Sequence, residues 1–134
     1  MMSLDDAYQL ISNEERERSF LITDPNQKDN PIVFANDAFV RLTGYEREEV
    51  LGRNCRFLQG TDTNPETVRA LREAIKGRQS ITVDILNYKK DRTPFWNRLR
   101  IRPLFSSSGD LTKFVAVQNP IANSEVDEVP RFLL

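Results

Sequence analysis

The first hydrophobic residues of the chain recur at helical spacing within residues 4–18. They are Leu4, Ala7, Tyr8 and Ile11, and they lie beside the charged run NEERER. This pattern predicts a short amphipathic helix whose apolar stripe needs a partner surface. Two strands are predicted next, FLIT and PIVFA, which flank the turn-rich DPNQKDNP and form an opening hairpin.

Short helices are predicted in the middle of the chain. Asn36 can cap a helix that Gly44 ends, and residues 46–51 predict one more helical turn. A longer helix is predicted over residues 65–76, because a proline opens it, its apolar residues share one face, and a glycine follows it.

From residue 80 onward the hydrophobic period changes to two, which is the period of a half-buried strand. Residues 80–88, 94–105 and 111–119 alternate in this way, and the polar turns KKDR and SSSGD separate them. Two strands, several short helices and three strands predict an α+β fold. We expect an antiparallel sheet with short helices packed on one face.

A length of 134 residues fits one domain. We divide it into an amphipathic N-terminal cap, a core domain and a C-terminal extension, at residues 1–18, 19–119 and 120–134. The extension is acidic with an apolar end, and its Pro130 interrupts any continuous helix, so we expect a cap or a mobile segment. Phe132 and Leu133, like Tyr8 and Ile11, could pack on the sheet or on a second subunit.

Composition excludes several functions. With 19 Lys and Arg against 20 Asp and Glu, the net charge of -1 gives no broad attraction to nucleic acid. No apolar run approaches the roughly 20 residues of a membrane span, and no signal-peptide pattern opens the chain, so we expect a soluble cytoplasmic protein. One cysteine and no histidine exclude an intrachain disulfide, a Cys/His zinc site and a His-dependent triad.

Each of the last three predicted strands carries one amide on its apolar face: Asn87, Asn97 and Gln118. The opposite face of the middle strand carries arginines at 98, 100 and 102, so the amide face is the one expected to be buried. A buried amide without a partner costs about 1–3 kcal/mol. The partners could be one another, buried water or loop backbone, or a flat heterocycle whose edge alternates donors and acceptors.

A second polar cluster, GRNCRFLQG, places Asn54, Arg56 and Gln59 around the lone Cys55. Arg72 on the following helix could lie near Arg56, and two neighbouring guanidinium groups suit a phosphate. Taken alone, the arginines are also consistent with solvated surface residues, and the cysteine with an inert buried side chain.

GRNCRFLQG resembles the signature of LOV domains, the flavin-binding branch of the PAS fold. The resemblance extends from about Phe20 through NPIVFANDAF, LTGY, ILNY and FWN to VAVQNP. It implies a five-stranded antiparallel sheet with helices over one face, and flavin mononucleotide (FMN) as the ligand. No kinase, phosphodiesterase, helix-turn-helix or long coiled coil is visible, so the chain resembles a short LOV protein.

The resemblance also implies roles for individual residues. Asn87 and Asn97 are implied to bond the pyrimidine edge of the flavin, and Gln118 to lie near nitrogen 5. Asn54 and Gln59 are implied to contact the ribityl and ring region. Arg56 and Arg72 are implied to hold the phosphate. The implied apolar walls of the ring site are Leu21, Ile32, Leu58, Leu99, Ile101 and Phe114.

Similar domains absorb blue light, after which the thiol corresponding to Cys55 adds reversibly to flavin carbon 4a while nitrogen 5 gains a proton. The amide of Gln118 should then reorient and pass the signal through the last strand to the terminal caps or a dimer interface. The implied function is a blue-light photoreceptor and not an enzyme. Its expected partners are the flavin, a second copy in a homodimer or light-dependent self-association, and an unknown downstream protein.

Two positions depart from the family pattern. Arg92 and Thr93 stand where a glycine is common, and Ala116 replaces a frequent glycine beside Gln118. Two other functions stay open. One is a flavin-binding redox or ligand sensor of PAS type, and the other is an enzyme with a cysteine nucleophile, whose base would have to be Asp, Glu or Lys.

Overall fold

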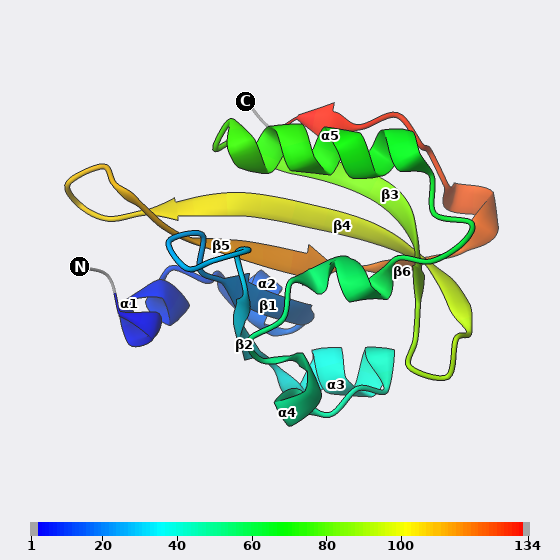
Figure 1. Cartoon of the computed structure of the whole chain (residues 1–134), viewed down its shortest axis with the longest axis horizontal. Coiled ribbons are helices and arrows are strands. Elements are labelled where there is room, and N and C mark those ends of the chain that lie inside the picture. The colour runs from blue at the N-terminus through cyan, green and yellow to red at the C-terminus, as the bar shows by residue number, and fades with distance from the viewer. Residues whose placement is uncertain (1–2, 133–134) are drawn as a thin grey trace.

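The computed structural model describes residues 3–132, and its centre is an antiparallel sheet with the strand order β2-β1-β5-β4-β3-β7 (Figure 1). The five long strands are β1 (Ser19–Thr23), β2 (Ile32–Ala35), β3 (Ile81–Tyr88), β4 (Pro94–Phe105) and β5 (Leu111–Gln118). The helices are α1 (Leu4–Gln9), α2 (Asn13–Arg16), α3 (Asp37–Thr43), α4 (Arg47–Val50), η1 (Cys55–Leu58), α5 (Pro65–Lys76) and η2 (Asn123–Glu125). Leu133 lies outside the described residues.

The predicted five-stranded antiparallel sheet and the α+β class are confirmed. Two short strands were not predicted, β6 (Pro120–Ile121), which pairs with β4, and β7 (Arg131–Phe132), which pairs with β3. A strand of two residues contains no alternation to detect. Both lie in the C-terminal extension and pair it with the sheet within the described residues.

The inner face of the sheet carries the helices between β2 and β3. Leu21, Val83 and Phe114 point to this face and form one core cluster with Phe39 of α3 and Leu71 of α5. The helix α5 is placed as predicted: its first residue is a proline, and the Asn64 side chain caps it by accepting a hydrogen bond from the N–H of Glu66. The covering helices leave space over one end of the sheet, and that space becomes the site described below.

The outer face packs on the N-terminal cap. Ala7 of α1 and Ile11 are buried against Phe20, Ile22 and Val115, which point away from the helix-covered face. Successive strand residues alternate between the two faces, and each apolar residue of β1 is thereby buried. The cap's apolar stripe thus packs on its own sheet.

The prediction of one helix over residues 4–18 is wrong, because two helices with a break between them occupy that range. The hydroxyl of Ser12 accepts a hydrogen bond from the Glu15 N–H at 3.1 Å, and the Glu15 carboxylate accepts one from the Ser12 N–H at 2.8 Å. This reciprocal pair starts a new helix at Asn13. The capping box outweighs the continuous helical spacing of the apolar residues.

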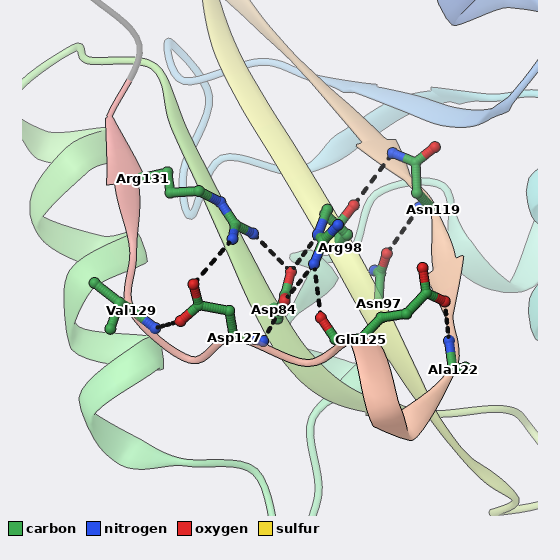
Figure 2. A network of polar contacts seen from close by, with 9 residues as sticks. All are labelled: Asp84, Asn97, Arg98, Asn119, Ala122, Glu125, Asp127, Val129 and Arg131. Carbon is green, nitrogen blue, oxygen red and sulfur yellow. Dashed lines mark hydrogen bonds and ion pairs between the residues drawn. The ribbon is translucent and has the colours of Figure 1, made fainter.

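The arginines on the outer face of β4 pair with acidic residues of the sheet and the N-terminal cap. Arg98 binds Asp84 of β3 through two hydrogen bonds, and Arg102 binds Glu15 of α2 in the same bidentate way. Arg98 and Asp84 also contact the C-terminal extension, as Figure 2 shows. The row of arginines therefore fastens both terminal segments to the sheet.

The hairpin between β3 and β4 keeps its turn although glycine is absent. Arg92 adopts a left-handed backbone with φ of 71°, the conformation that glycine adopts at least cost. Its guanidinium group lies 4.8 Å from the ring centroid of Tyr88, a cation–π contact that holds this side chain. Arg92 therefore occupies at this turn a backbone conformation that glycine would adopt readily.

Candidate functional site

A cavity of about 590 Å³ lies between the inner face of the sheet and the segment that carries η1 and α5. Its lining includes twelve of the predicted site residues, Leu21, Asn54, Cys55, Arg56, Leu58, Gln59, Arg72, Asn87, Asn97, Leu99, Ile101 and Gln118. It also includes Pro25, Gln27, Asp29, Asn30, Val68, Leu71, Ile75, Ile85 and Ala116. The tertiary structure thus brings the inward amides and the GRNCRFLQG cluster to one place.

Two predicted wall residues, Ile32 and Phe114, do not line this cavity. Both are buried in the inner-face core cluster beside it. Ile32 belongs to β2 at the edge of the sheet, and Phe114 pairs with Thr23, several residues along β5 from Gln118. Both therefore lie on the predicted face of the sheet, in the core beside the cavity, and their role as walls of the ring site stays a prediction.

The three inward amides are 1–3% exposed, and two of them are hydrogen-bonded to each other. Asn97 Nδ2 donates to Asn87 Oδ1 at 3.0 Å, and Asn97 Oδ1 accepts the N–H of Asn119 at 3.0 Å. These contacts fix which end of each amide faces the cavity. The amide hydrogens of Asn87 and the second hydrogen on Asn97 Nδ2 stay available to a ligand carbonyl, and Asn87 Oδ1 keeps a lone pair for a ligand N–H.

Gln118 is fixed from two sides. Its Oε1 accepts a hydrogen bond from the hydroxyl of Ser19 at 2.7 Å, and its Nε2 donates to the carbonyl of Ala116 at 3.1 Å. Ser19 is the first residue of β1 and lies directly opposite Gln118 in the β1–β5 register. Sequence reasoning missed Ser19, because the contact depends on pairing between strands 99 residues apart. One hydrogen on Gln118 Nε2 remains for a ligand acceptor.

Cys55 opens the short helix η1, which Asn54 caps by accepting the N–H of Arg56 at 3.0 Å. The amide of Asn54 also donates to the carbonyl of Asp29 at 2.8 Å, which joins η1 to the loop between β1 and β2. Burial raises the pKa of the Cys55 thiol. The group at the cavity wall is therefore the neutral thiol.

Asn30 is a polar lining residue that sequence reasoning missed. Its Oδ1 is buried and has no hydrogen-bond partner within the described residues. Its backbone is left-handed, with φ of 49°, and so is that of Asp29 before it. Asn and Asp tolerate this conformation, so Asp29 and Asn30 in DPNQKDNP predicted a turn. They gave no sign that the turn lies against the cavity. A buried acceptor without a donor in a cavity wall favours a ligand that carries hydroxyl groups.

The charged end of the cavity combines two exposed arginines with one carboxylate. Arg56 and Arg72 both line it, as the sequence predicted, and Arg56 is ion-paired to Asp29. Because this pair is more than half exposed, water screens it, and an anion can compete with Asp29 for the guanidinium. The inward amides that line the same cavity are uncharged. The cavity therefore suits a ligand that combines a neutral heterocycle with an anionic group.

Residues 3–132 contain no helix that is long and apolar enough to cross a membrane. Across the same described residues, no group of three or more Cys, Asp or Glu side chains is arranged to hold a metal ion.

The fold and cavity have a family counterpart. The model of the PAS domain family matches residues 17–121, which contain the cavity-facing strands and the helices over them. The chain belongs to the PAS domain family, and the relatives below place it among the LOV domains of that family.

The light-state structure of the blue-light photoreceptor Aureochrome1 LOV superposes with a TM-score of 0.79 at 40% identity, over 86% of this chain and 91% of the other. The LOV domain of an Erythrobacter litoralis blue-light activated histidine kinase gives 0.76 at 40% identity, over 79% and 97%. The predicted LOV resemblance is confirmed.

Longer relatives show the same similarity over part of their length. A blue-light-activated histidine kinase of Brucella anthropi is 54% identical over 98 residues, which are 73% of this chain and 20% of that protein. Blue-light-activated histidine kinase 1 of Erythrobacter litoralis is 49% identical over 109 residues, 81% of this chain and 30% of that protein. The chain spans 20–30% of the length of these relatives.

Proposed function

We propose that this chain is a blue-light photoreceptor domain that binds FMN in the cavity and reacts reversibly with it through Cys55. The observation that carries the proposal is the convergence of Asn87, Asn97 and Gln118 with the Cys55 thiol in one cavity of about 590 Å³. A cavity of this size matches the pockets that proteins use for small ligands and cofactors. The LOV relatives that share the fold support the choice of a flavin.

The heterocyclic end of the ligand would lie against the three amides. Asn87 and Asn97 together offer donors and an acceptor, the complement of a pyrimidine edge that alternates carbonyl and N–H groups. Leu99 and Ile101 of the same sheet face supply apolar contact for a flat ring. For this role the two side chains have only to be apolar and to match the shape of the ring.

The polar chain and the phosphate would extend toward the loop between β1 and β2. The unpaired Oδ1 of Asn30 is an acceptor for a ribityl hydroxyl, and Gln59 offers a second amide in the same wall. Arg56 and Arg72 would bind the phosphate, with Arg56 leaving Asp29 for the more highly charged group. The residues present therefore fit FMN along its whole length.

When bound, FMN would absorb blue light and supply both atoms that take up the Cys55 thiol, a ring carbon for the sulfur and a neighbouring ring nitrogen for its proton. The thiol is neutral because burial raises its pKa, so it brings the proton that this reaction needs. No oxidant or reductant beyond the chain and its cofactor is required.

Gln118 would relay the change. A ligand atom that turns from acceptor to donor requires the amide to present Oε1 in place of Nε2. Oε1 is held by Ser19, and Nε2 by the Ala116 carbonyl, which can only accept. Reversing the amide therefore loses about one hydrogen bond, worth roughly 0.5–1.5 kcal/mol. That change falls on the facing ends of β1 and β5, from which the two terminal segments continue.

The kinase activity in the names of the longer relatives is not part of this proposal, because the chain spans a minor share of those proteins. A homodimer, light-dependent self-association and a cytoplasmic location stay predictions from the sequence.

The test is the absorption spectrum of the purified, FMN-supplied chain before and after blue illumination. We expect a yellow protein that bleaches in light and recovers in darkness. The Cys55→Ala variant should stay yellow, keep its fluorescence and not bleach, because the bonding thiol is gone. A colourless wild-type protein, or bleaching that survives the substitution, would refute the proposal. A yellow wild type that never bleaches would favour a redox or ligand sensor.

A further inference from the structure

The mouth of the cavity is formed by the exposed residues of its described lining, which are Gln27, Asp29, Arg56 and Arg72. They come from three segments, the loop between β1 and β2, the short helix η1 and the helix α5. The other described lining residues are buried or half-buried. A ligand that fills the cavity therefore reaches solvent among these four side chains.

Asp29 is the one acidic residue among the described residues that line the cavity. Its carboxylate forms an ion pair with Arg56, and both side chains are more than half exposed. The carboxylate neutralises one of the two guanidinium groups of the mouth and repels other anions that approach it. Asp29 therefore opposes the binding of every anion at the mouth, including the phosphate of a flavin.

The backbone holds Asp29 beside its partner. The residue is left-handed, with φ of 67°, and its carbonyl accepts a hydrogen bond from Asn54 Nδ2 at 2.8 Å. The N–H of Ile32 donates to the carbonyl of Arg53 at 2.8 Å, which also joins the segment after the loop to the residues before η1. The carboxylate is therefore kept within reach of Arg56 at a high effective concentration.

Free and tethered anions meet this carboxylate on different terms. A free anion such as inorganic phosphate has to displace an intramolecular group from Arg56, and it gains only the contacts of the mouth. A phosphate attached to a flavin is itself intramolecular once the ring lies against Asn87 and Asn97. It also carries about −1.5 to −2 charges at neutral pH, against −1 for a carboxylate. The tethered phosphate therefore displaces Asp29 far more readily than a free one.

We propose that Asp29 determines the specificity of the mouth, because it holds Arg56 against free anions and yields it to a phosphate that belongs to a bound flavin. The proposal rests on the proposed function, since it requires FMN to bind with its ring against the amides and its phosphate at the arginines. It adds a residue that selects the ligand by opposing the wrong anions.

The first test compares the binding of FMN and riboflavin in titration calorimetry, with the full chain purified free of flavin. Asp29→Asn removes the charge and keeps a residue type that tolerates the left-handed backbone, and Asp29→Gly adopts that backbone at least cost. We expect both variants to bind FMN about three- to fivefold more tightly than the wild type does. Riboflavin has no phosphate, so its affinity should stay unchanged and report that the cavity is intact.

Glu66→Gln is the matched control. Its carboxylate is ion-paired with Arg69 at 2.8 Å on the exposed surface of α5, and neither residue lines the cavity. This variant has the same net charge as Asp29→Asn. We expect its FMN affinity to equal that of the wild type, which separates the place of the charge from the net charge of the chain.

The second test repeats the FMN titration with inorganic phosphate at constant ionic strength. We expect little change in the wild type and a loss of about threefold in apparent FMN affinity in both Asp29 variants, because free phosphate then gains access to Arg56. In an Arg56→Gln background, the gain in FMN affinity from Asp29→Asn should fall to less than half, because the ion pair is already gone.

FMN binding that neither Asp29 variant tightens would overturn the proposal, and so would equal inhibition by phosphate in the wild type and the variants. An equal gain from Asp29→Asn with and without Arg56 would assign the effect to repulsion at a distance, which also contradicts it. A wild type that binds FMN no more tightly than riboflavin would refute the phosphate end of the proposed function and this inference with it. A wild type that prefers FMN yet never bleaches would refute the photochemistry, and the binding tests would still decide on Asp29.

Discussion

Replacing Glu15 by glutamine should loosen the N-terminal cap more than any other single charge removed from α2. The carboxylate is 5% exposed and binds Arg102 at 2.8 and 3.0 Å. It also completes the capping box with Ser12. Hydrogen bonding to Arg102 is the largest cause that lowers the pKa of Glu15 to about 2, against the opposing effect of burial.

The size of the Glu15 contribution to the free energy of unfolding follows from its pKa shift. A pKa lowered from 4.5 to about 2 corresponds to roughly 3 kcal/mol of stability at neutral pH. The single amide oxygen of glutamine can still accept from the Ser12 N–H and Arg102 Nη2, which both bind Oε1, but the amide NH₂ would face Arg102 Nε, a donor. We therefore expect Glu15→Gln to cost about 2–3 kcal/mol in the free energy of unfolding. Because the folded pKa of Glu15 is depressed, its contribution is complete above about pH 4.5 and declines as the pH falls toward 2.

Urea unfolding between pH 7 and pH 3 measures both effects. The wild type should lose stability on acidification, and Glu15→Gln should lose less, because it lacks the group whose protonation removes the contact. Glu14→Gln is the matched control: its side chain is 62% exposed and, among the described residues, forms ion pairs with Arg18 and Arg100, so the substitution should cost below about 1 kcal/mol. Equal losses for the two variants at pH 7, or parallel pH profiles for wild type and Glu15→Gln, would refute the reasoning.

Two further substitutions test the cavity and its support. Gly60→Ala would place a Cβ 2.3 Å from a ring carbon of Tyr88, whose hydroxyl is fixed by the N–H of Asp62, so we expect a loss of about 1–3 kcal/mol by urea unfolding. A double-mutant cycle with Tyr88→Leu should show that the alanine costs less once the ring is gone, and additive losses would contradict the clash. Arg72→Gln should weaken FMN binding about tenfold in titration calorimetry but leave riboflavin binding unchanged, because riboflavin lacks the phosphate. An equal effect on both flavins would remove Arg72 from the phosphate site.

The sequence by itself determined the face of each long strand. Alternation along the chain put Asn87, Asn97 and Gln118 on the buried side and the arginines of β4 on the other, and the structure confirms both. The pattern succeeds because neighbouring strand residues point to opposite faces whatever the rest of the chain does. The nine residues of GRNCRFLQG likewise identified the family before any coordinates.

Tertiary structure decided how far along each face a residue lies and what stands opposite it. Ile32 and Phe114 have the correct face but miss the cavity, and Asn30 reaches it through a loop that carries no periodic signal. Ser19 meets Gln118 only because β1 pairs with β5. Periodicity is a relation between residues two or four positions apart, whereas these contacts depend on strand register and loop path.

The terminal segments also have some features that the sequence determined and others that only tertiary structure decided. Charge and apolar content marked residues 1–18 as a cap and residues 120–134 as a cap or a mobile extension, but neither the break at Ser12 nor the burial of Asp84 could be read from them. A carboxylate on the outer face of a strand is normally solvated. Asp84 is buried because Arg98, Arg131 and the backbone of the C-terminal extension surround it, and only the folded chain brings those groups together.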